Sequence, residues 1–333
     1  MELCQSLNLD NGTKLLFIPN SHHPVVSLQA WIRFGAGDED ESIAGIAHLF
    51  EHLLFKGTEK RAVGQIAREI ESLGGDLNAF TSYDHTVMHL TLASEHTKQG
   101  FEVLSDAIIN SVVNEDELSR EKPVILEEIK RRNDRPGSKA GDLVRKLLFG
   151  DHPYHRPVIG YADVVNNTPR EKIMEVYKRY YNRNNVFLVC CGDVSSEKAL
   201  EYANQYFDKL PDGEKVATRN DSKKNNTFTQ KFIHNDSPDS IMYLSCQGPS
   251  GSELDSAALD AWTLIMGQGE SSRLHNRLVL EEGRVRSLGA WCWAPRNKGS
   301  IDFAFRKSGG IANETEWIIA VSYTHLRAHE TCL

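Results

Sequence analysis

The sequence predicts an α/β or α+β protein whose first domain, about 210 residues long, carries helices in a layer on a sheet. Residues 25–34 alternate apolar and polar side chains, which is typical of a half-buried strand. Residues 62–73 instead repeat apolar side chains at spacings of three and four, which is typical of an amphipathic helix. Both patterns recur in turn along the chain, and this recurrence predicts the layered architecture.

The same two patterns define the expected elements of the first domain. Strands are expected at residues 13–18, 25–34, 77–82, 86–93 and 186–191. Helices are expected at residues 43–54, 62–73, 95–111, 115–133, 170–180 and 197–207. Ser42 is the expected cap of the first helix, and Pro123 is expected to bend the fourth helix or to begin a fresh segment within it.

A polar stretch rich in Asp, Lys and Asn divides the chain into two domains. We expect a first domain at residues 1–210, a linker at 211–228 and a partial second domain at 229–321. The second domain should contain a strand at 241–246 and a helix at 256–266. Residues 322–333 break the pattern and are similar to a spurious tail of assembled reading frames, so they are left out of the fold prediction.

Composition excludes several classes of protein. A hydrophobic share of 40% and a charged share of 25% are typical of folded globular chains. The net charge of -8 and the lack of a basic block argue against nucleic acid as a partner. The sequence has neither a membrane-length apolar run nor a secretory leader, so a cytoplasmic location is expected. Its six cysteines show no CxxC spacing, which argues against a thiolate zinc site.

The strongest chemical signal is the segment His-Leu-Phe-Glu-His inside the apolar helix expected at residues 43–54. His48 and His52 are four residues apart and point the same way from a helix, and Glu51 shares that face. Burying two imidazoles and a carboxylate without partners costs on the order of several kcal/mol, because each group loses its hydration. A zinc ion is the partner that satisfies all of them.

A catalytic zinc site needs a third protein ligand. The helix expected at residues 115–133 offers Glu121, Glu127 and Glu128. Seven residues are nearly two helical turns, so Glu121 and Glu128 share a face while Glu127 is rotated by about 100°. Spacing alone does not choose among the three.

Other histidine pairs have weaker claims to a metal. None lies in an apolar helix beside a carboxylate, so we expect them in loops, on the surface or, for the last pair, in the excluded tail. These pairs are His22 and His23, His85 and His89, His152 and His155, and His325 and His329.

The wider sequence frame resembles one family. HxxEH is the signature of inverted zincins. Gly-Ala-Gly-Asp-Glu precedes the motif from Gly35, Phe-Lys-Gly-Thr follows it from Phe55, and Asn-Ala-Phe-Thr-Ser follows from Asn78. Together they resemble the pitrilysin family of metallopeptidases, which includes insulysin and mitochondrial processing peptidase. The resemblance implies an α+β fold, with helices on a mostly antiparallel mixed sheet and a second, incomplete domain of similar type.

The resemblance also implies a role for each matching residue. His48 and His52 match the zinc histidines and Glu51 the general base. The family pattern of two glutamates seven residues apart selects Glu128 as the third ligand of a single Zn²⁺ and Glu121 as the carboxylate that orients a zinc histidine. Three further residues, Asn78, Ala79 and Phe80, match the strand on which an extended peptide substrate pairs. The implied reaction is endopeptidase hydrolysis by metal-activated water.

One position set departs from the family pattern. Many relatives carry an arginine and, seven residues later, a tyrosine that stabilise the reacting carbonyl, whereas this chain has Val279 and Arg286 there. Family members of this size work as dimers, some with a metal-free partner that supplies the pair. The resemblance therefore implies a dimer, with this chain as the zinc-bearing subunit.

Two other function classes stay open at this stage. Subunits of this fold also serve as non-catalytic structural parts of larger complexes, typically after losing the HxxEH residues, which are all present here. An HxxEH metal-dependent lyase is a further alternative, although the lyases with this motif are much shorter and use a cysteine as third ligand. Cleavage of a peptide together with metal content separates the three.

Overall fold

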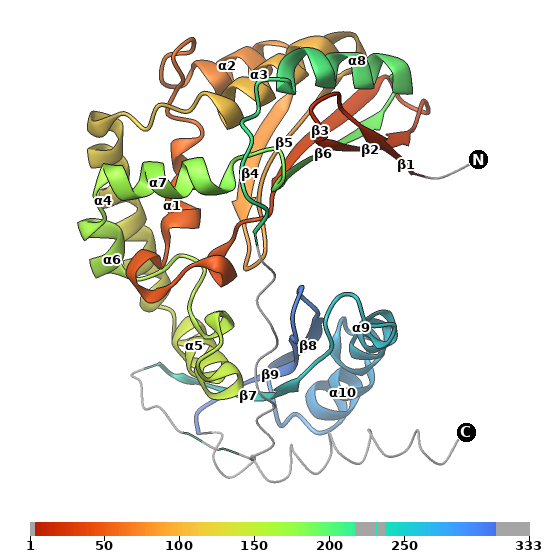
Figure 1. Ribbon diagram of the computed structural model, residues 1–333. Helices are drawn as coiled ribbons and strands as arrows, with labels where there is room; N and C mark the ends of the chain where they lie inside the picture. Colours follow the sequence, from red (N-terminus) through yellow and green to blue (C-terminus); the bar gives the residue numbers. More distant parts are fainter. Residues whose placement is uncertain (1–3, 217–228, 230, 232–236, 311–333) are drawn as a thin grey trace. The chain divides into compact units, whose positions relative to one another are not determined.

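A computed structural model describes residues 4–216, 229, 231 and 237–310 of the chain (Figure 1). These residues form two units, each with its own core. The first unit contains the described residues up to Lys130 and from Arg156 to 216, and the second contains the others. The predicted tail and most of the predicted linker lie outside the described residues. In the described part of the chain, no helix combines the length and the apolar character that crossing a membrane requires.

The first unit is built on a six-stranded mixed sheet with the order β1-β2-β6-β3-β5-β4. Only β2 and β6 pair in parallel, and the other neighbours are antiparallel. The strands are β1 (Gln5–Asn8), β2 (Lys14–Pro19), β3 (Val25–Ile32), β4 (Asp76–Thr81), β5 (Thr86–Ala93) and β6 (Val186–Gly192). A mostly antiparallel sheet with packed helices confirms the predicted α+β class.

Helices cover one face of this sheet, as Figure 1 shows for α3 and α8. Strand β3 buries every second side chain, from Val26 to Ile32, on that face, as the period of two requires. The helices of the first unit are α1 (Ile46–Leu53), α2 (Gln65–Ser72), α3 (Thr97–Ile109), α4 (Glu115–Asn133, whose last three residues belong to the second unit), α6 (Ala162–Asn167), α7 (Arg170–Tyr180) and α8 (Ser196–Phe207). Short 3-10 turns precede two of them: η1 (Ala36–Asp38) and η2 (Glu41–Ile43) lie ahead of α1, and η3 (Ser94–His96) lies ahead of α3.

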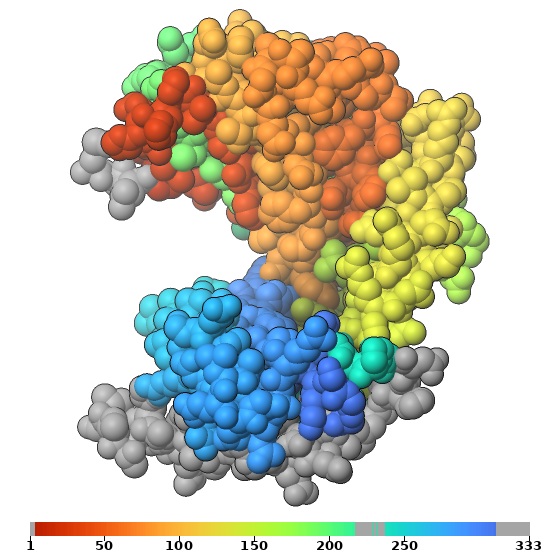
Figure 2. Space-filling view, turned by 180° about the vertical axis from the view of Figure 1, so that it is seen from behind, coloured from red at the N-terminus to blue at the C-terminus, as the bar shows by residue number. Residues whose placement is uncertain are grey.

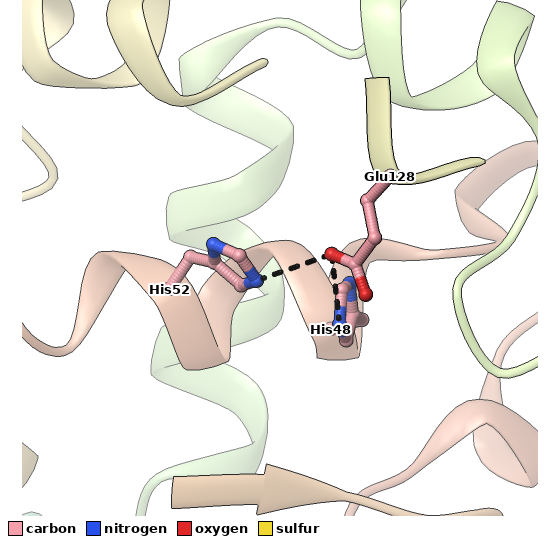
Figure 3. A group of neighbouring side chains, drawn as sticks. All are labelled: His48, His52 and Glu128. Atoms are coloured by element: carbon pink, nitrogen blue, oxygen red, sulfur yellow. Dashed lines mark ion pairs between the residues drawn. The ribbon is translucent and has the colours of Figure 1, made fainter. Parts of the chain in front are cut away.

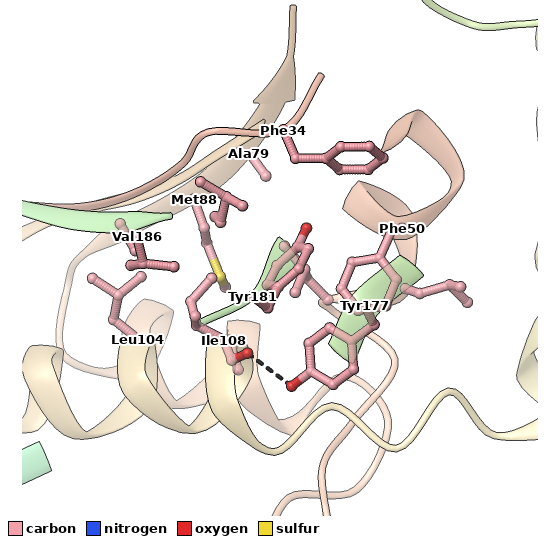
Figure 4. Close-up of a cluster of buried hydrophobic side chains, with 14 of the residues drawn as sticks. Phe34, Phe50, Ala79, Met88, Leu104, Ile108, Tyr177, Tyr181 and Val186 are labelled. Carbon is pink, nitrogen blue, oxygen red and sulfur yellow. Dashed lines mark hydrogen bonds between the residues drawn. The ribbon is translucent and has the colours of Figure 1, made fainter. Parts of the chain in front are cut away.

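The core of the first unit anchors α1. Phe50, fully buried, stacks on Tyr177 of α7 with ring centroids 4.8 Å apart and also packs on Tyr181 (Figure 4). The Tyr177 hydroxyl donates to the backbone oxygen of Ile108 at 2.8 Å, so the stack is also fixed to α3. Burial of one such aromatic side chain stabilises the fold by about 1.5–3 kcal/mol. The side of α1 opposite its polar residues is therefore held firmly.

The second unit has a three-stranded antiparallel sheet of its own, in the order β7-β9-β8. Its elements are α5 (Pro136–Phe149), η4 (Pro153–His155), β7 (Asp239–Gln247), α9 (Asp255–Gly267), α10 (Arg273–His275), the π-helical turn η5 (Asn276–Glu281), β8 (Ser287–Trp293) and β9 (Ser300–Ser308). Phe149 and Tyr154 pack on Trp293 with ring centroids 5.8 and 4.9 Å apart, which joins α5 and η4 to β8. The sequence-based division assigned residues 131–155 to the first domain, whereas in the structure they pack with the second unit.

Some element boundaries differ from the sequence prediction. Helix α1 begins at Ile46 and not after Ser42, because Gly45 adopts a left-handed φ of 104° directly before it. The side chain that caps the preceding turn η2 is Asp40, which accepts from the backbone N–H of Ser42. Pro123 is accommodated within a single helix, α4. The sequence patterns do not predict β1, α5, α6, β8 or β9.

Candidate metal centre

The candidate centre is built on the two-turn helix α1. Gly45 has the backbone conformation that lets the chain turn into the helix, and both carboxylate oxygens of the buried Glu39 accept from the first turn, from the backbone N–H of Gly45 at 2.8 Å and of Ala47 at 2.7 Å. These two hydrogen bonds favour the ionised form of Glu39, but burial outweighs them and raises its pKa to about 8. One turn separates His48 from His52, so both imidazoles project from the same face, with their ring centroids 4.8 Å apart.

The third member comes from α4. Nε2 of His48 and Nε2 of His52 lie 3.9 and 3.8 Å from Oε2 of Glu128. Figure 3 draws these two pairs as dashed lines from Glu128 to the histidines. One donor atom of each residue lies within 4.8 Å of the others. These spacings are too long for hydrogen bonds, so the three groups face a common point without bonding to each other.

The donor set fits zinc. Two imidazole nitrogens and one carboxylate oxygen form a known set for catalytic zinc, whose ligand atoms stand about 2.1 Å from the ion and hence about 3.4 Å from each other. Small side-chain movements bring the observed spacings to that value. Burial, together with the neighbouring His52, lowers the pKa of His48 against the opposing effect of the Glu51 and Glu128 carboxylates. A lowered pKa favours the neutral imidazole, which is the form that binds metal.

Glu121 is placed behind His52. Its Oε1 lies 2.9 Å from Nδ1 of His52, and its Oε2 lies 2.6 Å from Nζ of Lys56. Burial tends to raise the pKa of Glu121, but the hydrogen bonds from Lys56 and His52 outweigh this effect and hold it below its usual range. With Nδ1 engaged by this carboxylate, Nε2 of His52 is left to face the metal position.

The three glutamates of α4 thus have three different surroundings. The Glu128 side chain is 41% exposed and faces Nε2 of both histidines. The Glu121 side chain is 9% exposed and meets the histidines only at Nδ1 of His52. Glu127 faces away from the site and lies 4.0 Å from Lys130, with 68% of its side chain exposed. Helix α4 lies on the surface of the first unit, where its gold to yellow residues are visible in Figure 2. The alternatives that the spacing left open are therefore separated by geometry.

Glu51 lies on the same helix with a partner from the sheet. The Thr81 hydroxyl, at the end of β4, donates to Oε2 of Glu51 at 2.5 Å. The other carboxylate oxygen carries no such bond in the described residues. One oxygen of Glu51 is thus fixed by Thr81, and the second can accept a hydrogen bond or a proton.

The residues expected to contact substrate lie on β4. This strand pairs with β5 and stands at the end of the strand order, so its other edge has no neighbour among the described strands. Asn78 is exposed and Ala79 is buried. Phe80 is 43% exposed and packs edge-on against Trp31, with ring centroids 6.0 Å apart. A free strand edge presents the backbone groups that an added strand needs.

The sequence analysis missed three residues of this centre: Glu39, Lys56 and Thr81. Each lies inside a segment that the sequence analysis singled out: Glu39 in Gly-Ala-Gly-Asp-Glu, Lys56 in Phe-Lys-Gly-Thr and Thr81 in Asn-Ala-Phe-Thr. Their positions within these segments were the signal that could have identified them as part of the centre. Within the described residues, His48, His52 and Glu128 are the only group of three or more His, Cys, Asp or Glu placed to hold a metal.

Val279 and Arg286 stand where many relatives carry the arginine and the tyrosine. Val279 lies in η5, and Arg286 directly precedes β8. Val279 packs against the second unit's core, and the Arg286 side chain is 69% exposed, with its guanidinium 4.0 Å from Asp239. Neither residue lies in the first unit, which carries the histidines.

Two sequence models of one peptidase family match this chain. The model of the insulinase family, peptidase family M16, matches residues 15–161, and the model of the peptidase M16 inactive domain matches residues 167–305. The chain belongs to the M16 peptidase family, which confirms the resemblance found in the sequence.

Several curated relatives bear zinc protease names. The chain is 29% identical over 284 residues to an "Uncharacterized zinc protease" of Rickettsia bellii, an alignment that covers 85% of this chain and 68% of that protein. It is 31% identical over 275 residues to the zinc protease Mb2805c of Mycobacterium bovis, covering 82% and 62%. A probable mitochondrial-processing peptidase subunit beta of Arabidopsis thaliana is 28% identical, covering 82% and 54%. The chain thus spans between half and about two thirds of the length of these relatives.

Solved structures agree on the fold. A protease from Helicobacter pylori matches with a TM-score of 0.91 at 24% identity, covering 96% of this chain and 78% of that one. Pitrilysin matches with a TM-score of 0.75 at 18% identity, covering 98% of this chain and 36% of that one. At these identities the likeness supports the fold alone.

Proposed function

We propose that this chain is a zinc-dependent endopeptidase that hydrolyses extended or unfolded peptides and holds one zinc ion. The observation that carries the proposal is the convergence of His48, His52 and Glu128, with Glu51 on the same helix face. Membership of the M16 peptidase family supports the reaction class, and the relatives' zinc protease names support the metal.

In this proposal His48, His52 and Glu128 hold the ion, and Glu121 keeps the His52 ring turned toward it. A bound zinc ion supplies Lewis acidity, which polarises a peptide carbonyl and lowers the pKa of water from 15.7 toward about 7. The partial burial of the histidines, with 14% and 23% of their side chains exposed, strengthens the electrostatic effect of that charge.

Glu51 acts as the general base. Its free oxygen accepts the proton of the attacking water, while Thr81 holds the other oxygen. The same carboxyl group then delivers the proton to the amine that leaves when the C–N bond breaks. One carboxylate can serve both steps because it lies beside the ligands on the same helix.

The substrate adds to the open edge of β4. Main-chain hydrogen bonds along Asn78, Ala79 and Phe80 require an extended segment, so folded proteins are poor substrates and short or unfolded peptides are good ones. The exposed ring of Phe80 offers an apolar contact for a substrate side chain.

We also propose that the active form is a dimer in which a metal-free family member supplies the arginine and tyrosine that Val279 and Arg286 replace here. The same replacement favours the alternative of a non-catalytic subunit. Adding a partner subunit with that pair to the full chain discriminates the two: cleavage should rise by at least tenfold. Full activity of the chain as a homodimer disproves the need for the partner.

The general base is tested with Glu51→Gln. The variant should keep its zinc, because Glu51 is not a ligand, and should lose at least 100-fold in cleavage of a quenched fluorescent peptide. Glu127→Gln, on the exposed side of α4, is the matched control and should keep both zinc and activity. Undiminished cleavage by Glu51→Gln refutes the assigned base.

The ligand set is tested by metal content. Glu128→Gln should lower zinc affinity by at least 100-fold, because an amide oxygen is a far weaker ligand than a carboxylate. The neighbouring Glu127→Gln should bind zinc like the wild type, and the two are compared by competition with a chromophoric chelator. The opposite ranking would assign the metal to the other glutamate.

A further inference from the structure

Lys56 is a cation without an assigned role beside the proposed metal centre. It follows the end of α1 by three residues, and its backbone N–H donates to the carbonyl of Leu53 at 3.0 Å, so the chain still follows the helix there. Its ammonium group lies 2.6 Å from Oε2 of Glu121, and only 28% of its side chain is exposed. This is a short ion pair with a buried carboxylate and not a pair of solvated surface charges.

The two oxygens of Glu121 have separate partners. Oε1 faces Nδ1 of His52 and Oε2 faces Nζ of Lys56. A carboxylate with only one of these partners is free to rotate about its last bond and to move either oxygen away from the imidazole. Lys56 removes that freedom, so the hydrogen bond to His52 keeps one direction.

The position of Lys56 is itself fixed by the turn that follows it. Gly57 adopts a φ of 102°, and a Cβ atom there would stand 2.8 Å from the backbone oxygen of Arg61. The Thr58 hydroxyl donates to Oδ2 of Asp106 at 2.6 Å, and the Arg61 guanidinium donates to the same oxygen at 2.9 Å. This turn is therefore tied to α3 by buried groups, and it holds the backbone of Lys56 in place.

We propose that Lys56 is a positioning residue of the metal centre: it fixes the carboxylate of Glu121, which in turn fixes the ring of His52. The proposal rests on the proposed zinc site and extends it by one residue. Outer groups that orient a metal-binding histidine typically change metal affinity by about 10- to 100-fold when they are removed. Lys56 acts on zinc through Glu121 and not by contact with the ion.

The test measures zinc affinity of the full chain by competition with a chromophoric chelator, together with the thermal unfolding of the metal-free protein. Lys56→Met removes the charge and keeps the chain length, Lys56→Arg keeps a cation, and Lys60→Met places the same substitution at an exposed site four residues along the same turn. We expect Lys56→Met to bind zinc at least tenfold more weakly. Lys56→Arg should regain most of that loss, and Lys60→Met should match the wild type.

A double variant checks the route of the effect. If Lys56 acts through Glu121, then Lys56→Met should cost little further zinc affinity in a chain that already carries Glu121→Gln. A loss in the double variant equal to the sum of the two single losses, in logarithmic units, overturns the proposal. Wild-type zinc affinity in Lys56→Met overturns it too, as does a loss explained by unfolding of the metal-free variant.

These outcomes are separate from the fate of the proposed function. A wild-type chain that binds zinc and cleaves no peptide, alone or with a partner, disproves the peptidase and leaves the Lys56 result intact. A wild-type chain that cleaves peptides while Lys56→Met binds zinc normally disproves only the role of Lys56.

Discussion

The two ends of α1 are held by different kinds of contact. At the N-terminal end, Glu39 is 1% exposed and bonds to backbone N–H groups, and Gly45 packs backbone against backbone on Ile159 and Gly160. At the C-terminal end the contacts run through side chains: the buried carboxylate of Glu121 faces both Nδ1 of His52 and the ammonium group of Lys56, whose side chain is 28% exposed. The first end is thus held by backbone contacts, while the second depends on one ion pair between side chains.

This difference suggests a division of tasks along eight residues. The N-terminal end fixes where the helix begins and therefore the directions in which His48 and Glu51 point. The C-terminal end orients one candidate ligand, His52, through two side chains that are not part of the hydrophobic core. Changes at the N-terminal end should therefore reduce stability, and changes at the C-terminal end should mainly alter metal affinity.

The largest expected effect is that of Gly45→Ala. A residue with a side chain at φ 104° is strained by about 1–2 kcal/mol, and its Cβ would stand 2.7 Å from the backbone oxygen of Ile159, so the free energy of unfolding should fall by at least about 3 kcal/mol. Gly64 is the matched control, because it precedes α2 at a φ of 74° with nothing within 4 Å of its Cβ position. Gly64→Ala should cost only about 1 kcal/mol. Urea unfolding of both metal-free variants measures the difference. Equal losses of unfolding free energy contradict a special role of the N-terminal end of α1.

Glu39→Gln should have an intermediate effect with a marked pH dependence. Burial raises the pKa of Glu39 to about 8, against the opposing hydrogen bonds from Ala47 and Gly45 and the charge of Arg156. The unfolded chain ionises this group near pH 4.5, so between about pH 4.5 and 8 it binds fewer protons than the folded chain. The contribution of Glu39 to stability is therefore complete below pH 4.5 and declines by up to about 1.4 kcal/mol per pH unit until pH 8.

The measurement is the difference in unfolding free energy between wild type and Glu39→Gln at pH 5, 6, 7 and 8. We expect the unfolding free energy of the wild type to fall relative to that of the variant as the pH rises, because glutamine does not titrate. At pH 5 the folded wild type holds Glu39 protonated, so the two proteins should differ by less than about 1 kcal/mol, because the neutral acid and the amide each turn one donor group toward a backbone N–H. A difference that stays constant over this range means that Glu39 is ionised throughout.

The sequence predicted the fold where the local pattern and the tertiary packing agree. The ranges expected for α4 and α7 match Glu115–Asn133 and Arg170–Tyr180, since both helices carry regular apolar spacing. Helix α5 was missed because Gly137 and Gly141 lower its helix propensity, and it is stabilised by packing on β7. Local propensity contains no information about such packing.

The candidate site shows the same limit. The spacing of His48 and His52 predicts that they share a helix face, which needs only the helical period. It does not rank Glu121 against Glu128, because the two share a face and the choice depends on how α4 is shifted along α1. Thr81 was missed for a related reason: its contact with Glu51 joins residues 30 positions apart, and a threonine in a strand has no pattern of its own.

The smallest expected effect lies between the two ends, at Thr81. Its hydroxyl donates to Glu51 at 2.5 Å, and a hydrogen bond to a carboxylate contributes about 1.5–3 kcal/mol, so its loss should lower kcat by about tenfold or more. Thr81→Val keeps the shape of the side chain and removes the donor, whereas Thr81→Ser keeps the donor and removes a methyl group. Steady-state cleavage of a quenched fluorescent peptide should show a lower kcat for the valine variant alone, with KM and zinc content unchanged in both. Equal losses in the two variants would mean that Thr81 acts by packing, and that the Glu51 side of α1 is held by the core as its Phe50 side is.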